Sequence, residues 1–258
     1  MNVAILTIPA QRHRLFALSG HLKTIGFPVW DTEHIRIYNG ADVNDFSSRR
    51  DVAEAMWNDD FARWGDLVAS DDHSLNDPDY HNVCVEWGLL NILRKVLETG
   101  EDTLILENDA FFKNGVRYDD IVQHWEDLKA LVPYDDIHIA MLMHYETLYN
   151  YDDAGNATTQ VPSHEGERIN DFWQTGARSG GQVANIFTPQ GAHSILSEKP
   201  ALPTLEWYLA ENPTLTGVYS SIENQLDWQN AFFDFDSPHD PRSESVLFDY
   251  FKGENLCI

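Results

Sequence analysis

Apolar residues along this chain form short continuous runs that alternate with stretches of helical spacing. The run over residues 2–8 predicts a buried strand, and leucines at helical spacing over residues 15–25 predict the helix that follows it. A second apolar run over residues 35–38 ends at Asn39-Gly40, a pair that is typical of turns. A β-α-β beginning of this kind favours an α/β fold with a parallel sheet.

The same pattern predicts further elements downstream. Helices are expected over residues 52–69, 83–97, 121–131 and 189–196, and strands over residues 102–106, 137–143 and 183–187. Residues 70–82 are expected to form a loop. The periodicity fails between residues 144 and 182, which predicts an active-site loop or a disordered segment.

No linker rich in proline, glycine and serine divides the chain, so residues 1–258 are expected to form one domain. Its centre is predicted to be a mostly parallel sheet flanked by helices. The part beyond residue 197 mixes helix and turn signals, and it is left unassigned.

The charge of the chain narrows the choice of partners. It has 42 acidic and 17 basic residues, which give a net charge of −25, and 43% of its residues are apolar. A field of this sign repels nucleic-acid phosphates and anionic membrane surfaces, although ordinary solubility also explains it. No apolar run reaches the length that a membrane span needs, so neither nucleic acid nor a membrane is an expected partner.

Cysteine usage and the first residues predict a compartment. Cys84 and Cys257 are too few for a disulfide framework, which favours a reducing cytoplasm. The sequence MNVAILTIPAQRHR has no charged segment before its apolar run, so a secretory signal is not expected.

Two carboxylates follow the predicted strand that ends in TLILEND. Ligands of open α/β sheets bind at the carboxyl ends of the strands, and alternation along an extended chain would turn Glu107 and Asp109 to the same side. Hard oxygen donors of this kind suit Mn²⁺ or Mg²⁺, which would bridge to a phosphate that so acidic a protein otherwise repels. The alternative interpretation is a solvated strand-end turn or a helix cap.

Three short segments follow one another along the chain: LTIPAQRHR at residues 6–14, LILEND at residues 104–109 and FTPQGAHSIL at residues 187–196. Together they resemble glycosyltransferase family 25, the lipopolysaccharide and collagen sugar transferases. The resemblance spans roughly residues 3–196, and it implies a GT-A fold with a nucleotide site at the carboxyl ends of the strands. Asn108 replaces the middle acid of the family motif. The Ser-His pair of the family's preceding helix is missing, because Trp87 and Gly88 stand near its place.

The donor is expected to be a nucleotide-sugar, with UDP as the expected nucleotide. Its predicted contacts are Thr7, Ile8, Arg12, Arg14, Asn39, Glu107, Asn108 and Gln182. Arginine gives planar, charge-assisted contacts to phosphates, whereas ordinary surface charge is the alternative for both arginines. Asn39-Gly40 is also compatible with a plain turn. Gln182 lies in a glycine-containing segment that, with Trp173, is expected either to shape a sugar site or to be a surface loop.

The resemblance implies an inverting single displacement, which needs a carboxylate to take the proton of the acceptor hydroxyl. Glu223 and Asp227 are the candidate bases, with helix-cap or surface roles as alternatives. Asp109 and Glu107 are the expected ligands of Mn²⁺ or Mg²⁺, and His239 is a candidate third ligand that also fits a turn.

Two functions from different classes therefore remain open. The first is a metal-dependent glycosyltransferase that moves a sugar from a nucleotide-sugar to a hydroxyl of a glycan or another acceptor. The second is a catalytically inactive nucleotide-sugar or glycan binding protein with a transferase-like fold. Asn108 and the missing Ser-His pair motivate the second.

Overall fold

The computed structural model describes most of the first half of the chain and parts of the second. The described residues are 1–12, 14–29, 31, 33–42, 78–142, 147–151, 157–162, 166–175, 183–198, 217–222 and 225–226. The helix predicted over residues 52–69 lies outside this part of the chain.

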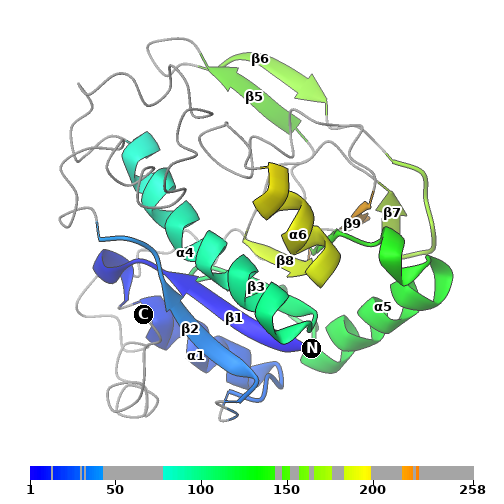
Figure 1. Ribbon diagram of the computed structural model, residues 1–258, viewed down its shortest axis with the longest axis horizontal. Coiled ribbons are helices and arrows are strands. Elements are labelled where there is room, and N and C mark those ends of the chain that lie inside the picture. The colour runs from blue at the N-terminus through cyan, green and yellow to red at the C-terminus, as the bar shows by residue number, and fades with distance from the viewer. Residues whose placement is uncertain are drawn as a thin grey trace.

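Seven strands of the described chain form one sheet, and two more form a separate hairpin (Figure 1). The strands are β1 (Asn2–Thr7), β2 (Ile35–Asn39), β3 (Thr103–Glu107), β4 (Ile139–Met141), β5 (Thr147–Tyr151), β6 (Ala157–Pro162), β7 (Trp173–Thr175), β8 (Ala184–Phe187) and β9 (Val218–Ser221). The order across the large sheet is β2-β1-β3-β8-β4-β9-β7.

The predicted α/β class is confirmed, but the sheet is mixed rather than mostly parallel. Parallel pairing joins β1 to β2, β1 to β3 and β4 to β9. The three pairs β3–β8, β4–β8 and β7–β9 are antiparallel. The prediction failed at β8, because a strand that is buried on both faces has the same apolar sequence pattern whichever way it runs.

Four α-helices flank this sheet in the described chain. They are α1 (Arg14–Thr24), α4 (Pro78–Thr99), α5 (Tyr118–Leu131) and α6 (Pro189–Glu198), and two short 3-10 helices, η1 (Pro9–Gln11) and η4 (Tyr134–Asp136), lie in the connections. Because α4 begins at Pro78, the last residues of the predicted 70–82 loop are helical. Proline is tolerated there because an N–H group in the first turn of a helix has no acceptor within the helix, so no hydrogen bond is lost.

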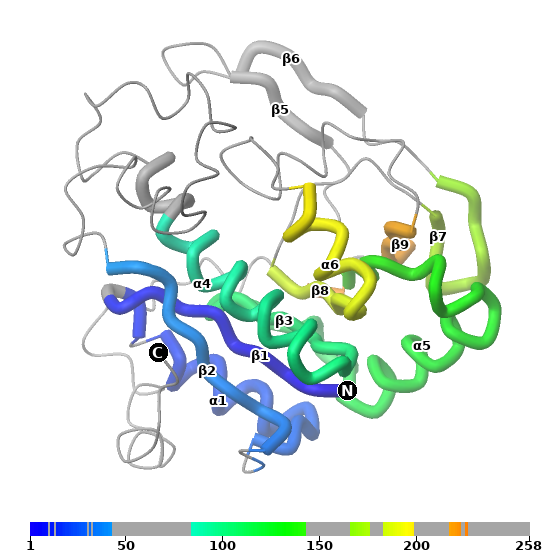
Figure 2. Tube along the Cα trace, in the orientation of Figure 1, coloured from blue at the N-terminus to red at the C-terminus, as the bar shows by residue number. Residues whose placement is uncertain are grey.

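The sheet separates two hydrophobic clusters. Val3 and Ile5 of β1 pack with α1 and α5, whereas Ala4 and Leu6 of the same strand pack with α4 and α6. Burial on both faces explains why β1 is a continuous apolar run instead of an alternating one. The tube in Figure 2 shows α4 lying along β1 and β2 on one face.

One glycine ends a helix, and another allows a helix to approach the sheet closely. Gly26, at φ 91°, ends α1: its N–H donates to the Lys23 carbonyl, and the Phe27 N–H donates to the Leu22 carbonyl at 2.9 Å. In α4, a Cβ at Gly88 would lie 2.4 Å from Leu6 Cδ1. This glycine therefore allows the N-terminal half of α4 to lie directly against the end of β1.

The segment predicted to be irregular, residues 144–182, contains regular structure. It includes the antiparallel hairpin β5–β6 and the edge strand β7, which pairs with β9. Residues 147–151 and 157–162 flank the sequence DDAGN, which is a turn composition between two segments rich in threonine and tyrosine. Within the described residues, no helix is long and apolar enough to cross a membrane.

Candidate functional site

The carboxyl ends of β2, β1 and β3 lie side by side, in that order, at one edge of the sheet (Figure 1). Thr7 pairs with Asn39 across β1 and β2, and Leu6 pairs with Glu107 across β1 and β3. Residues that are far apart in the sequence therefore gather at this edge, as the sequence predicts for Thr7, Asn39 and the acidic segment.

The centre of this edge is held by the Asn108 side chain. Its amide group donates to the Thr7 hydroxyl oxygen and to the Gln11 side-chain oxygen, each at 3.0 Å, and the residue is only 5% exposed. Asn108 thus ties the turn after β3 to the turn after β1. Gln11 was missed as a member of this network, although a polar residue in the turn after a buried strand is a signal that could have identified it.

Arg12 lies on the β2 side of the edge. It is exposed, and its guanidinium donates two hydrogen bonds to the Asn39 side-chain oxygen, at 3.1 and 3.3 Å. Thr7 and Ile8 are buried here, and the Thr7 carbonyl accepts a hydrogen bond from the Gly40 N–H at 2.7 Å. The predicted nucleotide contacts from the first two strands are therefore close neighbours.

Asp109 and Arg14 meet on the β3 side. The Arg14 Nη1 atom lies 4.0 Å from Asp109 Oδ2, and the two side chains are 24% and 27% exposed. The other carboxylate oxygen, Asp109 Oδ1, is buried and has no hydrogen-bond partner among the described residues. Burial raises the pKa of the Asp109 carboxyl, and the positive charge of Arg14 opposes that shift.

Glu107 is placed differently from the expectation. The extended chain ends at Glu107, and Asn108 and Asp109 form a turn in which the Ala110 N–H donates to the Glu107 carbonyl at 3.0 Å. Strand alternation puts the Glu107 side chain on the face of Ile105, which packs with α4 and α6, whereas Asp109 meets Arg14 of α1. The alternation that was expected to align the two acids therefore does not extend to Asp109.

Several other predicted site residues lie outside the part of the chain that the structure describes. These are Gln182, Glu223, Asp227 and His239. Trp173, one of the residues expected to shape a sugar site, is fully buried, and its indole N–H donates to the His124 carbonyl at 2.8 Å. The Trp173 ring is therefore part of the hydrophobic core.

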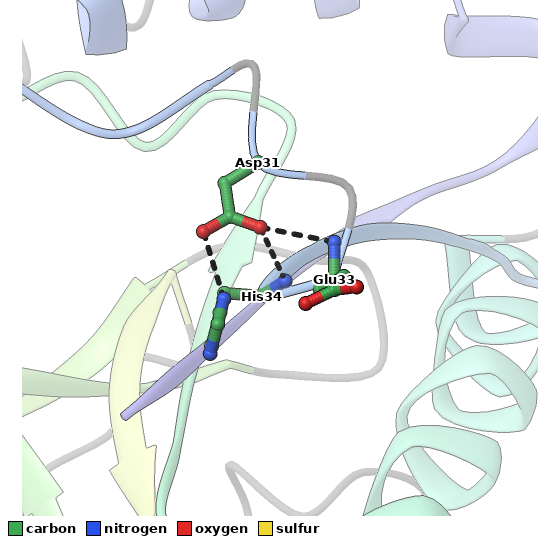
Figure 3. A group of neighbouring side chains, drawn as sticks. All are labelled: Asp31, Glu33 and His34. Carbon is green, nitrogen blue, oxygen red and sulfur yellow. Dashed lines mark hydrogen bonds and ion pairs between the residues drawn. The ribbon is translucent and has the colours of Figure 1, made fainter.

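A second acidic group lies just before β2, at the amino end of that strand. The Asp31 carboxylate accepts hydrogen bonds from the N–H groups of Glu33 and His34, and its Oδ2 atom lies 2.8 Å from His34 Nδ1 (Figure 3). Among the described residues, these three side chains form the one group with metal-ligand spacing, and Glu33 and His34 are exposed. Asp31 already uses both oxygens to close the turn, so this spacing alone does not indicate a metal.

Glu33 and His34 also line a cavity of about 220 Å³ between β2 and α4. Apolar side chains such as Ala4 and Val96 form part of its lining, and charges of both signs, including Arg36 and Glu101, lie around it. It opens near the amino ends of β1 and β2, opposite to the edge that carries Asp109.

Comparisons with known proteins do not assign the chain to a family. No protein-family model matches the sequence, and a search of curated proteins finds no match. The likeness to glycosyltransferase family 25 therefore stays a prediction.

Proposed function

We propose that this protein is a metal-dependent glycosyltransferase that moves a sugar from a nucleotide-sugar to an acceptor hydroxyl. The proposal includes the GT-A fold that the sequence motifs suggest. α/β proteins commonly bind nucleotides at the carboxyl ends of neighbouring parallel strands. The position of the site at such ends therefore supports the proposed function.

The observation that carries the proposal is the state of Asp109. A buried carboxylate oxygen without a hydrogen-bond partner is costly, and proteins usually avoid it. Such a group is expected where a ligand completes the site. An arginine lies 4.0 Å away, at the same sheet edge as a second arginine.

The donor set at this position suits a divalent cation. Mg²⁺ and Mn²⁺ are held by one or two carboxylates together with water and substrate phosphates, so a single well-placed aspartate is enough on the protein side. Asp109 is the proposed protein ligand and His239 remains a predicted contributor, whereas Glu107, whose side chain strand alternation places on the other face, is no longer expected to share the ion. The ion would supply positive charge that stabilises the departing diphosphate.

The remaining residues of the edge have distinct proposed roles. Arg12 and Arg14 contact the diphosphate, and the N-terminus of α1, which begins at Arg14, adds backbone N–H groups that favour anions. Thr7 and Ile8 offer backbone groups to the base. Asn108 holds the turn of Asp109 in position through Thr7 and Gln11 rather than contacting the ion itself.

In the chemical step, a carboxylate takes the proton of the acceptor hydroxyl, and the oxygen of that hydroxyl attacks the anomeric carbon. The bond to the diphosphate breaks at the same time, and the two arginines would stabilise the additional negative charge that develops on the diphosphate, helped by the positive charge of the ion when it is bound. Glu223 and Asp227 are the proposed sources of the base.

Calorimetry with a panel of nucleotide-sugars, with and without Mn²⁺, tests this function. Metal-dependent binding together with slow hydrolysis of one donor supports the transferase. Binding without any donor turnover favours the inactive binding protein, for which the loss of the middle acid at Asn108 is the motivating observation. No binding across the panel contradicts the transferase and favours a protein that binds a glycan instead.

A further inference from the structure

We propose that Arg14 is a built-in counter-ion for Asp109, which makes binding of the divalent cation depend on the diphosphate. This inference rests on the proposed function and adds a regulatory role to one of its residues. Without a nucleotide, the protein is expected to bind Mn²⁺ weakly, because the Arg14 guanidinium already lies beside the Asp109 carboxylate.

The geometry that supports this role is asymmetric. Arg14 lies 4.0 Å from one carboxylate oxygen of Asp109, Oδ2, while the second oxygen, Oδ1, is buried and has no hydrogen-bond partner among the described residues. The arginine therefore offsets the charge of Asp109 without satisfying its coordination. A partly buried pair is screened less by salt than a surface pair, so the two charges influence each other strongly.

A dication that approaches Asp109 alone meets an unfavourable field. It would bind a carboxylate that already has a guanidinium about 4 Å from one of its oxygens, and the positive charge of that guanidinium repels the ion. A diphosphate removes this conflict, because its oxygens accept hydrogen bonds from Arg14 and also coordinate the ion. Metal and diphosphate should consequently enter the site together.

Arg12 provides a matched comparison at the same edge. Its guanidinium is bound to the Asn39 side-chain oxygen, a neutral acceptor on the β2 side, instead of to a carboxylate. A substitution at Arg12 should weaken diphosphate binding while leaving the field at Asp109 little changed. The two arginines are thus expected to differ in their effect on Mn²⁺ alone.

The test measures Mn²⁺ binding without nucleotide by the loss of the free-ion electron paramagnetic resonance signal. The variants are Arg14→Gln, Arg12→Gln and the double variant Arg14→Gln with Asp109→Asn. Removing the competing charge in Arg14→Gln is expected to tighten Mn²⁺ binding about fivefold or more, which is the lower end of typical coupling between sites. Arg12→Gln should stay within about twofold of wild type, and the double variant should lose the gain.

The second measurement repeats the titration with saturating UDP. UDP relieves the repulsion between Arg14 and the ion, and this repulsion is absent in Arg14→Gln. The factor by which UDP tightens Mn²⁺ binding should therefore fall in Arg14→Gln and persist in Arg14→Lys, which keeps the positive charge. An Arg14→Gln variant that folds, as judged by circular dichroism, but binds Mn²⁺ no better than wild type overturns the inference. If Arg14→Gln does not fold, loss of the UDP effect in a folded Arg14→Lys variant overturns it, and its retention supports it.

Failure of this inference and failure of the proposed function give different results. A wild-type protein that binds neither UDP nor Mn²⁺ contradicts the proposed function. A wild-type protein that binds both, with Mn²⁺ affinities unaffected by the charge at Arg14, contradicts only the counter-ion role.

Discussion

The side-chain amide of Asn108 donates a hydrogen bond to the hydroxyl oxygen of Thr7 at 3.0 Å, across a separation of 101 residues in the sequence. A second bond of the same length, to Gln11, makes this side chain the link between the turns after β3 and β1. The residue that departs from the glycosyltransferase motif therefore has a structural function of its own.

Replacing Asn108 with alanine should destabilise the fold. The substitution leaves the Thr7 and Gln11 side chains without the donor that Asn108 provides in a buried place, which typically costs about 1–3 kcal/mol. Urea denaturation followed by tryptophan fluorescence measures the free energy of unfolding. As a control, Gln123→Ala removes an exposed bond to Asp127 and should change stability by less than about 0.5 kcal/mol. Equal effects of the two substitutions would contradict the structural role of Asn108.

Gly88 offers a test of how α4 lies on the sheet. A Cβ at this position would approach Leu6 Cδ1 to 2.4 Å and the Gly40 backbone nitrogen to 2.9 Å, so Gly88→Ala should cost about 1–3 kcal/mol of stability through overpacking. Thermal denaturation shows this as a lowered Tm.

The matched control for that substitution is Gly20→Ala in α1. A Cβ at Gly20 has no neighbouring atom within 4 Å, so the better helix propensity of alanine should stabilise the protein by up to about 1 kcal/mol. Opposite signs at the two glycines are expected. A stabilised Gly88→Ala variant would show that α4 does not lie against β1 and β2 as described.

Cys84 should be chemically inert in the folded protein. Its side chain is fully buried, and burial raises the pKa of the thiol from 9.0 to about 12, with the charge of Asp42 contributing in the same direction. This shift lowers the thiolate fraction by about a thousandfold at neutral pH. In a Cys257→Ser background, a thiol reagent should react with Cys84 only after denaturation. Rapid modification of the native protein would show that the thiol is accessible.

The same shift predicts how stability changes with alkaline pH. Because the folded-state pKa lies above the unfolded value, the native protein binds more protons than the unfolded chain between about pH 9 and pH 12. The contribution of Cys84 to stability is therefore complete below about pH 9 and is lost as the pH rises towards 12. Comparing the alkaline unfolding of Cys84→Ala with that of Cys257→Ser measures it, and a smaller loss over this range is expected in Cys84→Ala.

The sequence pattern predicted most of the elements that form the sheet edge. Strands β1, β2 and β3 and helices α1 and α5 lie within a few residues of their expected ranges, because continuous apolar runs and leucine spacing follow directly from burial. The neighbourhood of Thr7, Asn39 and the segment after β3 was also predicted, since parallel strands bring their carboxyl ends together.

Other features depended on contacts that a local pattern does not encode. The direction of β8 is set by its pairing with β3 and β4. The turn at Asn108 depends on hydrogen bonds to residues about 100 positions away, so the sequence alone suggested an extended chain that aligned Glu107 with Asp109. The partnership of Asp109 with Arg14 likewise arises only when α1 packs beside the end of β3.

The proposed metal site can be tested at Asp109 itself. Calorimetric titration with UDP in the presence and absence of Mn²⁺ should show metal-dependent binding to the wild-type protein. Asp109→Asn keeps the shape of the side chain but removes the charge, so the variant should fold normally and lose most of the metal-dependent affinity, about tenfold or more. If the folded variant binds UDP with the same dependence on Mn²⁺ as wild type, Asp109 does not hold the ion and the proposed metal site is wrong.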